Sequence, residues 1–221
     1  MNTIIEKITY HGTNSYLIKY KNKFILIDAG YPRLTKKLKI KLMKTNNLIE
    51  DISLIIITHS HKDHVGGLKK IKELSKAKII IHQNGKQNLI KGTSTFPAGT
   101  NFTGNILKKL ADSFFSSKFK SIKPDITYED VYDLHKYGIN GKIVHTPGHT
   151  DDSSCIIIEN NHCFVGDSLF NLPFSRTNYP IVANDEDKLI NSIKLLQNTG
   201  CKYFYPGHGK IFKEINLKKN I

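Results

Sequence analysis

The sequence predicts a protein of mixed α and β structure, and three observations lead to this prediction. Two sets of short stretches rich in Ile, Val, Phe and Tyr are typical of strands. Stretches with apolar residues at helical spacing lie between these strands and after them. A length of 221 residues allows one sizeable core, so we expect a single domain over residues 1–221.

The first part of the chain is predicted to form a β-meander, an outer helix and a β–loop–α–β unit. The expected elements are strands at 4–10, 15–20 and 24–27, a helix over 34–48, a strand at 54–57, a helix over 68–74 and a strand at 78–81. Lysines separate the apolar residues of the helix over 34–48, so it should lie on the outside of a sheet.

The last part of the chain is predicted to form a second set of strands and one long helix. The expected strands lie at 131–135, 142–145, 155–158, 162–165 and 203–205. Asn160–Asn161 suits a tight hairpin turn. Asp185 is expected to cap a helix that passes through Leu189 and Leu196 and stops near Gly200.

Composition and charge indicate an ordinary globular protein. The formal net charge is +14, but all of the 33 basic residues except Arg33 and Arg176 are lysine. Arginine is the preferred residue for phosphate and base recognition, and the lysines are scattered, so we expect a solvated surface and no nucleic-acid partner. No apolar run approaches the ~20 residues of a membrane span, and the N-terminus lacks a signal-peptide layout. We therefore expect a cytoplasmic protein with a small-molecule substrate and no membrane partner.

The three cysteines are an odd number without a CxxC pair. Cys155 and Cys163 lie in strand-like apolar runs, and Cys201 precedes the last strand. We expect buried, reduced thiols at all three positions.

The sequence His59-Ser60-His61-Lys62-Asp63-His64 has the composition of a metal site. It follows the apolar run that ends at Ile57 and precedes the helix expected from Leu68. Because His59 and His61 are two residues apart, they point the same way on an extended segment. Asp63 and His64 fall where the chain turns and can address a second point. Imidazole and carboxylate ligands suit zinc, and also iron or manganese.

This segment resembles the HxHxDH signature of the metallo-β-lactamase-fold hydrolases. Three later segments extend the resemblance in order and content: 146–150 (TPGHT), 165–170 (VGDSLF) and 205–209 (YPGHG). Together they are similar to the glyoxalase II-type branch, and the resemblance spans the chain from Asp28 to His208. It implies a four-layer αββα sandwich, the metallo-β-lactamase fold.

The resemblance also implies a site with two divalent metal ions, most simply zinc, with iron or manganese as other choices. The first ion would be bound by His59, His61 and His149. The second would be bound by Asp63, His64 and His208. Asp167 would bridge the two ions, Asp63 would also carry a proton to the leaving group, and Asp28 would support the metal loop. A water-derived hydroxide between the ions would be the nucleophile.

Other residues have less specific expectations. His11, His82, His145 and His162 fill no ligand position, so we expect structural roles for them. Residues 85–125 break the strand and helix pattern, with an apolar stripe from 106 to 115. The stripe fits a core helix, but in this fold the corresponding segment often forms an arm over the metal cleft. In that case Phe96, Phe102, Phe114 and Phe115 are candidates for the substrate pocket wall.

The function expected from the resemblance is metal-dependent hydrolysis of a small ester, thioester or lactone, similar to hydroxyacylglutathione hydrolase. The chain ends soon after His208, without the helical domain with which glyoxalase II binds glutathione. Alternatives are an enzyme similar to the acyl-homoserine lactonases, a mononuclear iron persulfide dioxygenase, and a phosphodiesterase or nuclease of the same fold. Phe170 stands where the lactonases usually carry Tyr, and β-lactamases generally lack an Asp at the position of Asp167.

Overall fold

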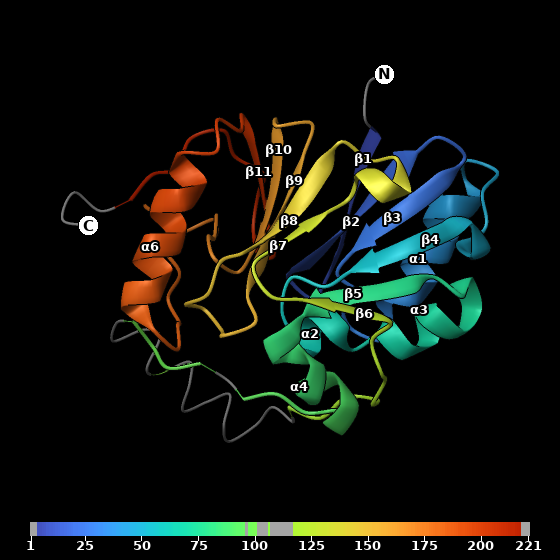
Figure 1. The fold of residues 1–221 in the computed structure, drawn as a ribbon, viewed down its shortest axis with the longest axis horizontal. Coiled ribbons are helices and arrows are strands. Elements are labelled where there is room, and N and C mark those ends of the chain that lie inside the picture. Colours follow the sequence, from blue (N-terminus) through green and yellow to red (C-terminus); the bar gives the residue numbers. More distant parts are fainter. Residues whose placement is uncertain (1–3, 96, 101–105, 107–116, 218–221) are drawn as a thin grey trace. The chain divides into compact units, whose positions relative to one another are not determined.

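The computed structural model describes residues 4–95, 97–100, 106 and 117–217 (Figure 1). The chain forms two compact units. The first unit comprises residues 1–94 and 118–127, and the second comprises residues 95–117 and 128–221. Most of the apolar stripe at 106–115, and the candidate pocket residues Phe96, Phe102, Phe114 and Phe115, lie outside the described residues.

The first unit is built on a mixed sheet with strand order β1-β2-β3-β4-β5-β6. The strands are β1 (Ile4–Tyr10), β2 (Thr13–Tyr20), β3 (Lys23–Ile27), β4 (Ile52–Ile56), β5 (Lys78–His82) and β6 (Ile126–Tyr128). The first three strands pair antiparallel, and β3, β4 and β5 pair parallel. A parallel pair needs a crossover connection, and helices supply it on each side of β4.

The helices of the first unit connect these parallel strands and cover one face of the sheet. They are α1 (Leu34–Met43), η1 (Ile49–Asp51), α2 (Lys62–Val65), α3 (Leu68–Ser75), η2 (Gln83–Gly85) and α4 (Lys86–Lys91). Leu38 of α1 and Ile71 of α3 pack in one core with Leu26, Ile55 and Ile79 of the sheet. Alternate residues of the strands, such as those at 25, 54 and 80, point to the other face and are also buried.

The second unit is built on a five-stranded sheet with order β11-β10-β9-β8-β7. Its elements are β7 (Val131–Asp133), η3 (His135–Tyr137), β8 (Gly141–His145), β9 (Ser154–Ile158), β10 (His162–Gly166), α6 (Glu186–Gln197) and β11 (Tyr203–Pro206). All pairs are antiparallel except β10 with β11, which α6 connects. Leu189, Ile193 and Leu196 of α6 share a core with Val165 and Phe204 of the sheet.

The elements expected from sequence are found, with corrected boundaries. The helix expected over 34–48 ends at Met43, because the chain turns and Asn46 has a φ of 53°. The β9–β10 hairpin turn places its left-handed residues at Glu159 and Asn160, one position earlier than expected. Helix α4 was not expected. Asp185 caps α6 as predicted, since its side chain accepts a hydrogen bond from the backbone N–H of Lys188.

Within the described part of the chain, no helix combines the length and the apolar character that crossing a membrane requires.

Leu38 provides a test of how α1 packs. Its side chain is fully buried, so Leu38→Ala should lower the free energy of unfolding by about 2–5 kcal/mol. Met43 lies on the same helix and is 66% exposed, so Met43→Ala should change stability by less than about 0.5 kcal/mol. Urea denaturation followed by circular dichroism measures both, and equal midpoints for the two variants would contradict the packing described.

Candidate metal centre

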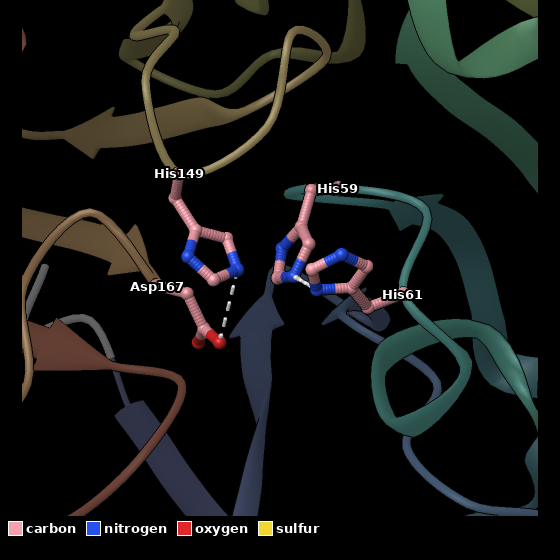
Figure 2. A group of neighbouring side chains, drawn as sticks. All are labelled: His59, His61, His149 and Asp167. Carbon is pink, nitrogen blue, oxygen red and sulfur yellow. Dashed lines mark hydrogen bonds and ion pairs between the residues drawn. The ribbon is translucent and has the colours of Figure 1, made fainter. Parts of the chain in front are cut away.

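The loop after β4 and the helix α2 that follows it carry four ligand-type side chains, which we call the His59–His64 cluster: His59, His61, Asp63 and His64. His59, His61 and His64 are buried, with exposed fractions of 1%, 7% and 0%. Figure 2 shows His59 and His61 side by side, with Nε2 of His59 3.0 Å from Nδ1 of His61. Three adjacent imidazoles buried at a strand end are not typical of a solvated loop. His59 and His61 thus lie next to each other, as their spacing of two residues predicted.

Asp28, at the end of β3, holds this loop in place. Its Oδ1 accepts a hydrogen bond from the Thr58 backbone N–H, and its Oδ2 accepts one from the Thr58 hydroxyl, both at 2.8 Å. Oδ2 also lies 2.8 Å from Nδ1 of His64. A carboxylate only accepts, so Nδ1 of His64 carries a hydrogen atom and Nε2 of the neutral ring presents its lone pair. This is the supporting position that the sequence predicted for Asp28.

The hydroxyl of Thr58 passes this orientation on to His59. The hydroxyl has a single hydrogen atom, which it donates to Asp28, so it accepts from Nδ1 of His59 at 3.1 Å. Nε2 of His59 therefore also presents a lone pair. Asp28 thus determines which ring nitrogen carries a hydrogen atom in two histidines. It does so directly in His64 and through Thr58 in His59.

Thr13 and Asn88 support the same cluster, and neither was predicted from the sequence. The Thr13 hydroxyl, at the start of β2, donates to Oδ2 of Asp63 at 3.0 Å. Nδ2 of Asn88, on α4, donates to the Ser60 hydroxyl at 2.8 Å. Tyr31 lies near enough for Asp63 to act on it: burial raises the pKa of the Tyr31 phenol, and the Asp63 carboxylate raises it further. Contacts between residues so distant in sequence leave no local pattern to detect.

The second unit carries its own ligand-type group, which we call the Asp167 cluster: His149, Asp167 and His208. Asp167 follows β10, His208 follows β11, and His149 lies in the loop after β8. Oδ2 of Asp167 lies 3.6 Å from Nε2 of His149 (Figure 2) and 3.3 Å from Nε2 of His208. Neighbouring strands thus deliver the members of the cluster to one edge of the sheet.

The ring orientation of His149 is also fixed. Its Nδ1 lies 3.0 Å from the backbone carbonyl of Val182, which can only accept, so Nδ1 carries the hydrogen atom. Nε2 of the neutral ring then directs a lone pair towards the Asp167 carboxylate. The 3.6 Å between these atoms is longer than a hydrogen bond.

Both clusters have the donor chemistry and spacing of a divalent metal site. Two ligand atoms that each lie ~2.1 Å from a tetrahedral ion are about 3.4 Å apart. The distances of 3.6 Å and 3.3 Å around Asp167, and 3.5 Å between Nε2 of His64 and Oδ2 of Asp63, match this value. In each unit a ring nitrogen faces a carboxylate oxygen, and both atoms are of the kind that bind divalent cations. The residues present therefore fit divalent metal ions.

The loop that carries His149 is packed closely against the start of α6. The Ser192 hydroxyl donates to the Pro147 carbonyl at 2.7 Å, and the Asp185 N–H donates to the Gly148 carbonyl at 3.0 Å. Gly148 has a φ of 136°, and a Cβ there would lie 2.3 Å from the backbone N and Cα of Leu189. Only glycine permits this approach, which explains the Pro-Gly-His sequence of the loop.

The four histidines expected to have structural roles and the three cysteines expected to be buried lie in surroundings that fit these expectations. His11 lies at the tip of the β1–β2 hairpin with a φ of 49°. His82 accepts from the N–H of Asn84, His145 contacts the carbonyl of Asp151, and His162 contacts the Tyr205 hydroxyl. None of the four belongs to either cluster. The thiols of residues 155, 163 and 201 are free and buried, as predicted.

A buried set of imidazoles and carboxylates at strand ends defines the class of the protein as a metal-dependent hydrolase, and comparison with known proteins agrees. The family model described as the metallo-beta-lactamase superfamily matches residues 8–208. A probable metallo-hydrolase of Methanocaldococcus jannaschii is 34% identical over 206 residues, which are 91% of this chain and 89% of the relative. The chain belongs to the metallo-β-lactamase superfamily.

More distant proteins share the fold over nearly the whole chain. The beta-lactamase-like protein 2 homolog of Caenorhabditis elegans is 29% identical over 94% of this chain, which spans 59% of that relative's length. A subclass B3 metallo-beta-lactamase from a soil metagenome library has a TM-score of 0.67 at 20% identity, over 91% of this chain and 75% of that one. The FEZ-1 enzyme of Legionella gormanii has a TM-score of 0.66 at 19% identity, over 92% and 76%. The expected α+β fold of this family is thereby confirmed.

The role of Asp28 can be tested in the metal-free protein. In Asp28→Asn, an amide group faces the donors of Thr58 and His64, one of which loses its acceptor. We expect the free energy of unfolding in EDTA to fall by about 1–3 kcal/mol. Glu73→Gln, at an exposed position of α3, should change it by less than about 0.5 kcal/mol. Equal urea midpoints would mean that Asp28 does not hold the loop.

The close approach at Gly148 gives a second test. Gly148→Ala forces a Cβ into the backbone of α6 and should cost about 3 kcal/mol of stability. Gly200→Ala is the matched control, because Gly200 also has a positive φ but a Cβ there meets nothing within 4 Å. It should cost about 1–2 kcal/mol, the penalty of the left-handed conformation alone. Thermal unfolding compares the two, and the packing argument fails if Gly200→Ala costs as much as Gly148→Ala.

Proposed function

We propose that the two clusters together bind two divalent metal ions, most simply zinc, and that the protein hydrolyses a small ester or thioester. In this proposal one ion is bound by His59, His61, His149 and Asp167. Asp63, His64 and His208 would hold the other, and Asp167 would be shared between the two ions, as the family resemblance implies. All seven residues fall within the part of the chain that matches the family model.

One observation carries the proposal: in each cluster Nε2 of a histidine faces a carboxylate oxygen at the spacing of two ligands of one metal ion. In the first unit Nε2 of His64 lies 3.5 Å from Asp63, and in the second Nε2 of His149 lies 3.6 Å from Asp167. Hydrogen bonds on the opposite ring nitrogens fix both orientations. A ring nitrogen and a carboxylate oxygen held at this spacing suit a divalent cation.

Two bound cations supply a water of lowered pKa as nucleophile and positive charge for the developing oxyanion. The chain's own residues prepare the site for this chemistry. Asp28 and Thr58 hold the ring orientations of His59 and His64, and the Thr13 hydroxyl holds the Asp63 carboxylate by donating to Oδ2. Asp63 is 22% exposed at its side chain, so it can also pass a proton between the leaving group and solvent.

Phe170 favours an ester or thioester over a lactone as substrate. Its ring lies edge-on to His149 and to His208, with centroid distances of 6.3 and 5.4 Å. A phenylalanine at this place forms an apolar wall and donates no hydrogen bond to a carbonyl. The acyl-homoserine lactonases usually carry a tyrosine there. A hydroxyacyl thioester of the kind that glyoxalase II hydrolyses needs no such hydroxyl.

Metal content tests the proposal directly. Protein grown with zinc should contain about two ions per chain by elemental analysis, and His208→Gln should reduce this to about one. His135→Gln, at an exposed position on η3, should keep both ions. Fewer than one ion per chain in the wild-type protein would sink the proposal. About one iron per chain, with oxygen consumed in the presence of a persulfide, would identify a dioxygenase instead.

Activity tests the substrate class. The zinc-loaded protein should hydrolyse hydroxyacyl thioesters or aryl esters faster than γ-lactones or bis(p-nitrophenyl) phosphate. Asp167→Asn should lower kcat at least about 100-fold, because it weakens the ligand shared by both ions. Faster turnover of the phosphodiester than of every acyl substrate would overturn the assignment while leaving the metal site intact.

A further inference from the structure

The net positive charge of the protein resides in one of its two units. The first unit has 21 lysine and arginine residues against 7 aspartate and glutamate residues, a formal net charge of +14. The second has 12 against 12 and is formally neutral. The lysines are scattered along the sequence, so this division becomes visible only when the chain is divided into its compact units. A general compositional bias towards lysine should charge both units alike.

Among the helices of the first unit, α1 has the most lysines, and its outer face also exposes apolar side chains. The buried side of the helix consists of Leu34, Thr35, Leu38 and Leu42. At 100° per residue, the direction opposite this side is occupied by Lys36, Ile40 and Met43, with further lysines at 37, 39 and 44 on the flanks. Ile40 is 46% exposed and Met43 is 66% exposed. Leu48, just after the helix, is 60% exposed.

This arrangement of apolar residues flanked by lysines suits the interface of an anionic bilayer. In such a helix the apolar side chains enter the boundary between headgroups and acyl chains, and lysines extend to the lipid phosphates. α1 has no acidic residue along its length to oppose this contact. A hollow beside it is lined by Lys7, Ile8, Thr9, Lys37, Ile40, Lys41 and Lys44. Of these lysines, Lys41 forms an ion pair with Glu6 and Lys37 donates to the backbone carbonyl of Thr9.

Two other partners fit this face less well. A nucleic acid prefers arginine forks and stacking aromatic rings, whereas the first unit has one arginine, Arg33, and the centre of the α1 face is aliphatic. A second copy of the chain would place two units of charge +14 against each other, and like charges oppose association.

We propose that the outer face of α1, formed by Lys36, Lys37, Lys39, Ile40, Met43 and Lys44, docks the protein on an anionic lipid surface. The contact is peripheral: the side chains reach the headgroup region while the helix stays packed on its own sheet. It requires no metal and is independent of the proposed hydrolysis. The lysines supply attraction that salt weakens, and Ile40 and Met43 supply a part that salt does not weaken.

Co-sedimentation with phospholipid vesicles tests this proposal on the full-length protein. Vesicles of mixed phosphatidylglycerol and phosphatidylcholine should pellet the protein at least about tenfold more strongly than pure phosphatidylcholine. Lys36→Gln/Lys39→Gln/Lys44→Gln should weaken binding about tenfold or more, and Ile40→Ser/Met43→Ser should weaken it severalfold even at high salt. Circular dichroism confirms that each variant is folded.

Matched variants of the neutral unit serve as controls. Lys142→Gln/Lys194→Gln/Lys202→Gln removes the same charge from exposed positions there, and Val131→Ser/Leu195→Ser removes two exposed apolar side chains. Both should bind vesicles as the wild type does. Equal losses in the α1 and control variants would show a net-charge effect and overturn the proposal. Binding to RNA that the α1 lysines support, without binding to vesicles, would identify a nucleic-acid surface and also overturn it.

Discussion

The hydrogen bonding of the buried Asp28 carboxylate is the interaction on which the His59–His64 cluster depends. It lies at the end of β3 with a φ of 59°, a left-handed conformation that Asp tolerates better than most residues. From there it accepts hydrogen bonds from the backbone and the hydroxyl of Thr58 and contacts Nδ1 of His64. A carboxylate that is 2% exposed is stable only with such partners. The same contacts that satisfy Asp28 therefore orient the histidines.

A second constraint is that the ligand-type residues follow strands of a sheet whose register is set by buried side chains. The parallel pairing of β3 with β4 places Ile27 opposite Ile56, so the residues that follow, Asp28 and Thr58, come within hydrogen-bonding distance. The parallel pairing of β10 with β11 does the same for Asp167 and His208 in the second unit. A slip of one residue would turn the apolar side chains of a strand to the other face, so the core itself fixes the position of the site.

The sequence predicted most strands and the main helices because these leave local signals, whereas the support from Asp28 was implied by the family resemblance. Alternating apolar residues, an aspartate before a helix and histidines two apart all follow from the geometry of a single segment. Thr13, Asn88 and the close approach of Gly148 to Leu189 could not be predicted this way. Each depends on two segments that meet only after folding. The early end of α1 at Met43 was missed because the apolar spacing continues to Leu48 while the backbone turns at Asn46.

The division of charge and the metal clusters place different demands on the first unit. Metal binding at the His59–His64 cluster, as proposed, needs imidazole and carboxylate ligands, whereas an excess of positive charge on the same unit opposes the approach of a cation. Asp28 and Asp63 offset that opposition locally, because their carboxylates lie within 2.8 and 3.5 Å of the His64 ring nitrogens. The lysines of α1 project from the exposed side of a helix whose other side is packed in the core. Screening by salt limits the range of their field to about 10 Å, which reduces the conflict between a strongly basic surface and the proposed binding of divalent ions.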